Sequence, residues 1–275
     1  APTCVAAARL LGQPGLPRRR RERPVVFVHV HKAAGSFMCG MASLNNERIV
    51  EPGVNCNWVL HDDFKQMGDG VRVTCEERAE QFSNVSWAHI EREFTVHDFC
   101  PQHFDYVTVL REPAGLVQSE VNFRNFSVSE LEASLSCTKG LEPCDESHKD
   151  DNVPLWKFLD NFQVRMLGGM ETWQLPPGGV LPEHKDRVVS LLERFYRVIP
   201  FDRLKSSPTL LKSSFGWSTD QLAQKDPMGD WERNPLNPAV RPCNLTLSAA
   251  QIQRVQRASQ LDAELYEHFR ARFSE

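Results

Sequence analysis

The chain has 275 residues, of which 41% are hydrophobic and 25% are charged. These proportions are ordinary for a globular protein, and the length suits one large α/β domain. The net charge of −4 gives no reason to expect a general nucleic-acid-binding protein, and no apolar run is long enough to span a bilayer.

The N-terminal residues 1–23 are predicted to be a stem or linker that precedes a single domain at 24–275. A segment rich in Pro and Gly (Gly12–Pro17) is followed there by a basic run, Arg18–Arg23, with one Glu. The chain begins with Ala rather than Met, so we expect a processed or excised portion of a longer protein. A membrane anchor, if the protein has one, would then lie outside this sequence.

The first βα unit is predicted over residues 25–44. The apolar run Val25–Val30 is typical of a strand buried on both faces, as in a parallel sheet. A loop of small residues and the start of a helix follow. The positive end of a helix and its free N–H groups attract an anion, so this turn is predicted to bind phosphate. The expected binding residues are Lys32, Ala33, Ala34, Gly35, Ser36 and Phe37.

The polar, Gly-containing residues 45–83 are expected to carry substrate-binding elements, and a strand is expected near 85–90. A second buried strand, Asp105–Leu110, leads into Arg111 and then a helix at 113–124 that carries Ser119. Arginine presents a planar set of donors that suits phosphate, which makes Arg111 and Ser119 further candidates for anion binding.

The C-terminal half of the chain is predicted to be mostly helical. Residues 127–152 are acidic and rich in Ser, and are expected to form an exposed insertion. Apolar residues at helical spacing predict amphipathic helices at 154–167 and around 188–195, and 202–214 is also expected to be helical. A short strand is expected at 196–200, and Ser248 with Gln251 forms a capping box for the last helix.

The eight cysteines and the sequons at Asn84, Asn125 and Asn244 favour an oxidising, glycosylating lumen. Cys137 and Cys144 flank a short loop and are predicted to form a small disulfide. Cys56 with Cys75 and Cys100 with Cys243 are further expected pairs, which the sequence by itself leaves open.

The order Lys32, small residues, Ser36 resembles the 5′-phosphosulfate loop of the sulfotransferases that use 3′-phosphoadenosine 5′-phosphosulfate (PAPS), written roughly Pro-Lys-Thr-Gly-Gly-Thr-Thr. Arg111 and Ser119 match that family's Arg and Ser eight residues apart, which hold the 3′-phosphate. The segments 161–169 and 195–217 are similar to the Golgi heparan sulfate 2-O- and 6-O-sulfotransferases. The resemblance implies a P-loop-like αβα sandwich with a central parallel sheet.

This chain departs from the sulfotransferase pattern at several positions. Ala33 and Ala34 stand where Thr-Gly is usual, Phe37 replaces a second hydroxyl, His31 replaces Pro, and Leu116 stands where a second Arg is common. The backbone cradle does not depend on these side chains, but one contact to the phosphosulfate is expected to be missing.

The resemblance implies transfer of a sulfuryl group from PAPS to a glycan hydroxyl, with His89 as the base and Lys32 neutralising the leaving phosphate. Histidine suits proton removal near neutral pH. Glu91, Glu93 and His97 are the alternative bases. His29 and His31 lie two apart on one strand face, yet no third ligand has metal-site spacing, so no metal is expected.

The expected protein is a Golgi-lumenal enzyme, part of a single-pass type II membrane protein or of the secretory pathway, whose partner is a glycan or another hydroxyl-bearing acceptor. No nucleic-acid partner is expected, and the oligomeric state is left open. One alternative is a non-catalytic glycan-binding scaffold of the same fold. The other is a nucleotide-dependent kinase, which would need a Gly-Lys-Ser/Thr loop and a magnesium-binding carboxylate, neither of which is evident.

Overall fold

A four-stranded parallel sheet with the strand order β2-β1-β3-β4 forms the centre of the protein. The strands are β1 (Val25–Val28), β2 (Trp87–Ile90), β3 (Asp105–Leu110) and β4 (Arg197–Pro200). The computed structural model describes residues 23–50, 55–58, 74–94, 98–140, 143–144, 153–206, 208–218 and 245–273. An α/β fold with a central parallel sheet is therefore confirmed.

The two inner strands, β1 and β3, are apolar along most of their length because helices cover both faces of the sheet. Every residue of β1 and of β3 is buried. Val25 of β1 pairs with Trp87 of β2 on one side and with Asp105 of β3 on the other. This register brings the carboxyl ends of the three strands to the same edge of the sheet.

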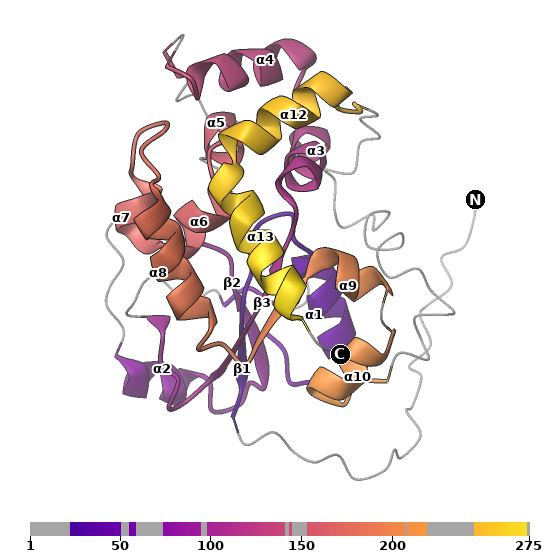
Figure 1. Ribbon diagram of the computed structural model, residues 1–275. Helices are drawn as coiled ribbons and strands as arrows, with labels where there is room; N and C mark the ends of the chain where they lie inside the picture. The colour runs from indigo at the N-terminus through magenta and orange to yellow at the C-terminus, as the bar shows by residue number, and fades with distance from the viewer. Residues whose placement is uncertain are drawn as a thin grey trace, which may run out of the picture.

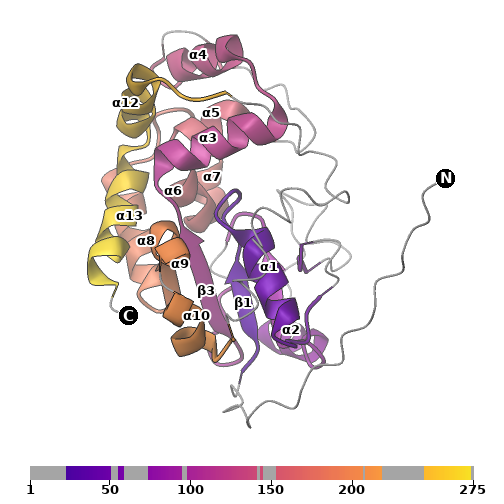
Figure 2. The same ribbon diagram turned by 90° about the vertical axis from the view of Figure 1, so that its right-hand side faces the viewer.

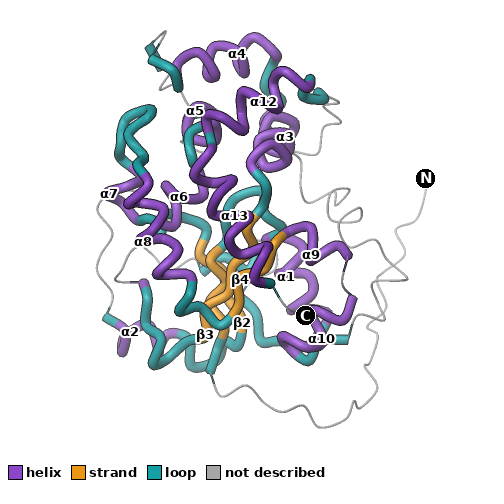
Figure 3. The backbone as a smooth tube through the Cα atoms, viewed as in Figure 1, coloured by secondary structure: helices purple, strands orange, loops and turns teal. Residues whose placement is uncertain are grey.

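Helices lie on both faces of the sheet and above its carboxyl edge (Figures 1, 2 and 3). In Figure 2, α1 lies on one side of the strands, while α8 and α13 lie on the other. The helices of the described residues are α1 (Gly35–Leu44), α2 (Cys75–Gln81), α3 (Pro113–Arg124), α4 (Val128–Cys137), α5 (Leu155–Leu159), α6 (Phe162–Leu167), α7 (Gly169–Trp173), α8 (Pro182–Leu192), α9 (Phe201–Ser206), α10 (Pro208–Phe215), α12 (Ala249–Ala258) and α13 (Gln260–Arg272).

The amphipathic helix predicted over 154–167 is two helices, α5 and α6, separated at Asp160 and Asn161. Asn161 adopts a left-handed backbone conformation (φ 55°), which Asn tolerates better than most residues. Its side chain accepts a hydrogen bond from the N–H of Leu261, and Asp262 accepts from the N–H of Gln163 at the start of α6. The C-terminal helix therefore supplies partners that compensate for the break.

The predicted last helix is also divided in two. The capping box of Ser248 and Gln251 is confirmed at the start of α12. The helix ends at Ser259, whose hydroxyl donates to the carbonyl oxygen of Leu159 at 3.0 Å, and α13 follows. The connection between α12 and α13 thus packs against the connection between α5 and α6. The two interruptions, which are distant in sequence, therefore stabilise each other.

Part of the segment 127–152 is a packed helix rather than exposed chain. Ser127 caps α4 together with Glu130, and Leu131 and Leu135 of this helix are buried. Figure 1 shows α4 beside α12 at one end of the molecule. Residues 145–152 of the expected insertion lie outside the described residues.

Three disulfides link the described cysteines, and one of them is the predicted Cys137–Cys144 pair. The other predicted pairings are wrong, because Cys39 pairs with Cys56 and Cys75 pairs with Cys100. Sheet formation brings α1 close to the segment 55–58 beside β2, and α2 close to the chain that enters β3. Cys243 lies outside the described residues.

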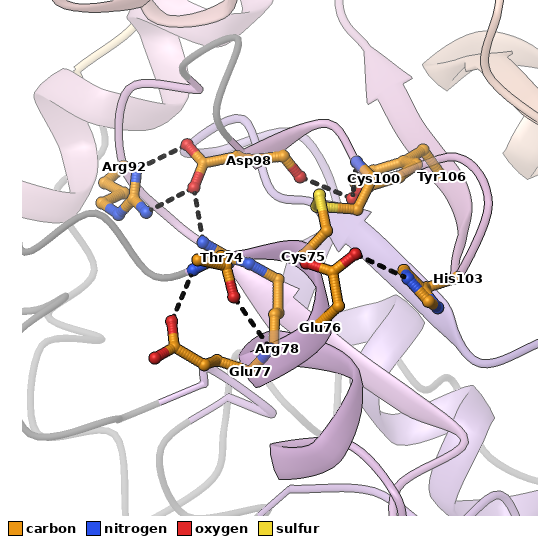
Figure 4. Close-up of a disulfide and its surroundings, with 10 residues drawn as sticks. All are labelled: Thr74, Cys75, Glu76, Glu77, Arg78, Arg92, Asp98, Cys100, His103 and Tyr106. Carbon is orange, nitrogen blue, oxygen red and sulfur yellow. Dashed lines mark hydrogen bonds and ion pairs between the residues drawn. A yellow bond between two sulfur atoms is a disulfide. The ribbon is translucent and has the colours of Figure 1, made fainter.

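Figure 4 shows that the Cys75–Cys100 disulfide lies beside a buried ion cluster. The carboxylate of Asp98 accepts hydrogen bonds from Arg78 (2.9 Å) and from Arg92 (2.9 and 2.8 Å). The neighbouring Tyr106 hydroxyl accepts from the N–H of Cys100 at 2.8 Å. This cluster connects α2 to Arg92, which follows β2, and to Asp98, which precedes β3.

Candidate functional site

The loop between β1 and α1 has the shape expected of an anion cradle. Lys32 and Ala34 both have left-handed backbone conformations (φ 63° and 65°), which L-residues other than Gly adopt at a cost of about 1–2 kcal/mol each. Ala34 is the N-cap of α1 and makes no side-chain capping bond. The N-terminus of this ten-residue helix is therefore not capped by a side chain, and Ser36 is exposed in its first turn.

Gly35 allows the start of α1 to lie against the side chain of His29, the residue that follows β1. A Cβ atom at this position would lie 1.9 Å from Nε2 of His29, whose side chain is only 4% exposed. No side chain larger than hydrogen fits without moving the imidazole. Ala33 and Phe37, which flank this contact in the sequence, are buried. Of the six predicted loop residues, these two therefore contribute to the packing of the turn.

The two predicted phosphate motifs meet in the structure, although 79 residues separate them in sequence. An Nη atom of Arg111 donates to the carbonyl oxygen of Lys32 at 2.8 Å. Thr108 of β3 donates in addition to the carbonyl oxygen of Val28 at the end of β1 (2.8 Å). These bonds hold the Lys32 loop in its strained conformation and place the Arg111 guanidinium beside it.

The meeting point coincides with a reversal of the strand order. From β1 the chain continues to β2 on one side, whereas from β3 it continues to β4 on the other side. The connections that leave β1 and β3 therefore diverge, and open α/β sheets bind ligands at such a divergence, outside the carboxyl ends of the strands. The sequence motifs and the topology independently indicate the same location.

Ser119 lies half-buried on α3, about two turns after Pro113. The residue that follows it, Glu120, is fully buried and forms an ion pair with His31 of the loop, so this turn of α3 lies beside the cradle. Leu116 is buried in the core. The ammonium group of Lys32 lies 3.7 Å from the ring centre of Phe123 on the same helix.

His31 joins three segments of the site. Its Nδ1 lies 2.8 Å from Glu91, which follows β2, and its Nε2 lies 3.1 Å from Glu120 of α3. Glu91 also lies 3.2 Å from Nδ1 of His29, and Asn57 donates to it at 2.7 Å. Burial opposes protonation of His31, but Glu120 and Glu91 outweigh that effect and raise its pKa to about 9. The imidazole is therefore a cation at neutral pH.

The two carboxylates next to His31 are ionised. Burial works against ionisation of Glu91, yet His29 and His31 hold its pKa well below the usual range. Burial likewise opposes ionisation of Glu120, while His31, Arg124 and Lys32 lower its pKa. The loop is thus attached to its surroundings by charges as well as by backbone bonds.

His89, the expected base, belongs to β2 and is buried in the interior of the protein rather than exposed at its surface. Its side chain is 0% exposed, and its Nε2 accepts a hydrogen bond from the indole N–H of Trp87 at 2.8 Å. Burial, followed by repulsion from His29, holds the pKa of His89 well below its usual value, so the ring is neutral at physiological pH. A neutral imidazole has the protonation state of a base, but its Nε2 lone pair already accepts from Trp87.

The alternative bases differ in their surroundings. Glu91 retains some exposure and lies between two histidines. Glu93 is 2% exposed, and burial raises the pKa of its carboxyl. His97 lies outside the described residues. Glu91 is therefore the accessible competitor of His89.

One contributor to the site was assigned no role from the sequence pattern, whereas Gln163 and Arg165 of the predicted 154–167 helix were given as residues that could face the site. Glu120 carries no signal beyond its position after Ser119. Gln163 lies on the polar side of the predicted 154–167 helix and forms two hydrogen bonds with the main chain of Arg111. Arg165, from the same segment, is instead fully buried and donates to Asp160 and to the carbonyl oxygens of the α7–α8 connection.

Across the ranges that the structure describes, no group of three or more His, Cys, Asp or Glu side chains is arranged to hold a metal ion. Within the same ranges no helix combines the length and the apolar character needed to cross a membrane. A scan against models of known protein families finds no match for this chain, and a search of curated proteins finds none. A functional assignment therefore depends on the motifs and their geometry.

Proposed function

We propose that this protein is a PAPS-dependent carbohydrate O-sulfotransferase with a P-loop-like αβα fold, acting in the Golgi lumen. One observation carries the proposal. Arg111, the expected 3′-phosphate ligand, donates to the carbonyl oxygen of Lys32, the expected 5′-phosphosulfate ligand, at the carboxyl edge of adjacent strands. Two motifs that resemble one family's donor site are thus neighbours in space.

The residues of the loop fit the 5′-phosphosulfate group of the donor. The N-terminus of α1 lacks a capping side chain, Ser36 offers an exposed hydroxyl, and Lys32 supplies a positive charge. Arg111, stacked 4.3 Å from the ring centre of Phe201, offers a planar donor set for the 3′-phosphate. Charged ligands of this kind are held well by oriented N–H groups and a helix dipole.

Sulfuryl transfer requires alignment and stabilisation of charge rather than a covalent intermediate. The acceptor oxygen forms a bond to sulfur while the bond from sulfur to the bridging phosphate oxygen breaks. Negative charge collects on the 5′-phosphate of the leaving 3′-phosphoadenosine 5′-phosphate, where the α1 N-terminus and Lys32 stabilise it. The proton of the acceptor hydroxyl passes to a base, assigned to His89 with Glu91 as the alternative. For His89 to accept the proton, its Nε2 must first release the indole N–H of Trp87.

The proposed compartment is supported by the covalent structure. Three disulfides form among the described cysteines, and such bonds persist in oxidising compartments. Two of the sequon asparagines, Asn84 and Asn125, are exposed to solvent. These features favour a lumenal or secreted protein, of which Golgi residence is the proposed case.

Calorimetric titration with 3′-phosphoadenosine 5′-phosphate tests the donor site. We expect the wild-type protein to bind with micromolar affinity and Arg111→Ala to bind at least tenfold more weakly, a loss of about 1.4 kcal/mol. Arg187→Ala, which removes an exposed arginine of α8, is the matched control and should bind as the wild type does. A folded wild-type protein that does not bind the nucleotide would refute the proposal.

A second candidate function is a non-catalytic glycan-binding protein of the same fold, and the complete burial of His89 favours it. Transfer of labelled sulfate from PAPS to a panel of desulfated glycans separates the two. Turnover that is lost in His89→Ala, with nucleotide binding retained, supports the enzyme with His89 as base. Loss in Glu91→Gln alone would assign the base to Glu91. Binding of nucleotide and glycan without turnover would favour the scaffold.

A further inference from the structure

We propose that Gln163 is a positioning residue that sets the orientation of Arg111. It thereby determines how strongly the protein prefers a nucleotide with a 3′-phosphate over one without it. This inference rests on the proposed function. The argument begins with the main chain of Arg111, which leaves the end of β3 just before α3 begins. Arg111 therefore lies in the short connection between the strand and the helix.

The side chain of Gln163 fixes that segment with two hydrogen bonds. Its Oε1 accepts from the N–H of Arg111 at 2.9 Å, and its Nε2 donates to the carbonyl oxygen of Arg111 at 2.7 Å. A primary amide that bonds both groups of one residue imitates a neighbouring β-strand. The side chain is 0% exposed, so these bonds do not compete with water.

Gln163 is itself held in place from the C-terminal part of the chain. The carboxylate of Asp262 in α13 accepts from the N–H groups of Gln163 (2.9 Å) and Val164 (2.8 Å). These bonds satisfy N–H groups at the start of α6 and lock the backbone that carries the amide. A continuous series of contacts therefore runs from α13 through Gln163 to Arg111.

The guanidinium of Arg111 completes this series by donating to the carbonyl oxygen of Lys32. A shift of the Arg111 backbone would move the guanidinium away from Lys32 and from the 3′-phosphate position. The N-terminus of α1, which receives the 5′-phosphate, would stay in place, because the Thr108–Val28 bond and the ion pairs of His31 hold the loop without Arg111. The loss is therefore expected to be selective for the 3′-phosphate.

The test is a double-mutant cycle between Gln163→Leu and Arg111→Ala, measured by calorimetry with two ligands. These are 3′-phosphoadenosine 5′-phosphate and adenosine 5′-phosphate, which lacks the 3′-phosphate. Gln163→Leu should weaken binding of the first ligand about tenfold, as expected for two lost neutral hydrogen bonds, and leave that of the second within twofold. In the Arg111→Ala background, Gln163→Leu should cause little further loss.

The control variant is Gln251→Leu, which makes the same substitution at a glutamine whose Oε1 accepts from the N–H and the hydroxyl of Ser248 and whose Nε2 donates to Glu132. It should bind both ligands as the wild type does. If Gln163→Leu does not fold, Gln163→Glu serves in its place, since it keeps an acceptor for the Arg111 N–H and loses the donor.

Three outcomes are distinguishable. Selective, non-additive loss of affinity for the 3′-phosphorylated ligand supports the role of Gln163. Equal weakening of both ligands, or a loss that adds fully to that of Arg111→Ala, overturns it and leaves the proposed donor site intact. A wild-type protein that binds neither ligand overturns the proposed function, and this inference with it.

Discussion

Deprotonation of His31 is expected to destabilise the fold as the pH rises from about 6.5 to about 9. The imidazole lies between Glu91 and Glu120, at 2.8 and 3.1 Å, and burial opposes its charge less than these carboxylates favour it. Its pKa is about 9 in the folded chain, against an ordinary value of 6.5. A group with a raised folded-state pKa stabilises fully below its unfolded pKa, and that contribution disappears above its folded pKa.

The size of the effect follows from the two pKa values of His31. At ~1.4 kcal/mol for each pH unit, the difference between 6.5 and about 9 corresponds to about 3 kcal/mol of folding free energy. Lys32 and Arg124 contribute indirectly, since they lower the pKa of Glu120 and so keep this carboxylate ionised beside the imidazolium. A loss of about 3 kcal/mol is a large fraction of the stability of a typical domain.

Urea unfolding of the wild type and of His31→Gln at pH 6 and pH 9.5 measures this contribution. The wild type should lose about 3 kcal/mol more than the variant between the two pH values. His184→Gln, on α8, is the control and should retain the pH dependence of the wild type. Parallel profiles for wild type and His31→Gln, or an NMR titration of His31 with a midpoint at or below 6.5, would refute the reasoning.

Two further predictions concern the loop and its attachment. Gly35→Ala should lower the free energy of unfolding by about 1–3 kcal/mol in a urea titration, because the new methyl group would lie 1.9 Å from the His29 ring; unchanged stability would mean that the ring moves freely. Replacing the Cys39–Cys56 disulfide with two serines should cost about 3 kcal/mol by calorimetry, since it closes a 17-residue loop, and more than the same change at Cys137–Cys144, which closes 7 residues; the reverse order would contradict the loop-entropy argument.

The local elements of this fold were largely readable from the sequence. The strand Asp105–Leu110 and the helix 113–124 have the predicted bounds, because a β-branched apolar run and a Pro at the first helical turn are local signals. The breaks at Asn161 and Ser259 were not predicted. Their compensation comes from residues about a hundred positions away, which no local pattern contains.

The site was predictable in part. Lys32 and Arg111 each follow a buried strand, and parallel strands bring their carboxyl ends to one edge, so their proximity follows from the motif order once β1 and β3 are neighbours. The surroundings of His89 were not predictable. Its burial depends on which face of β2 is covered and on Trp87, whose indole N–H reaches it only in the folded sheet.

The sequence by itself determined the buried strands, the small-residue turn that ends at Gly35, the arginine after β3 and an even set of cysteines, because each depends on local propensity or composition. The tertiary structure decided the strand order, the pairing of the cysteines, and the two hydrogen bonds between Gln163 and the main chain of Arg111. It also decided the charge of His31, because a pKa responds to carboxylates on other segments that approach only after folding. Contacts between distant segments are determined by packing, and packing is a property of the whole chain.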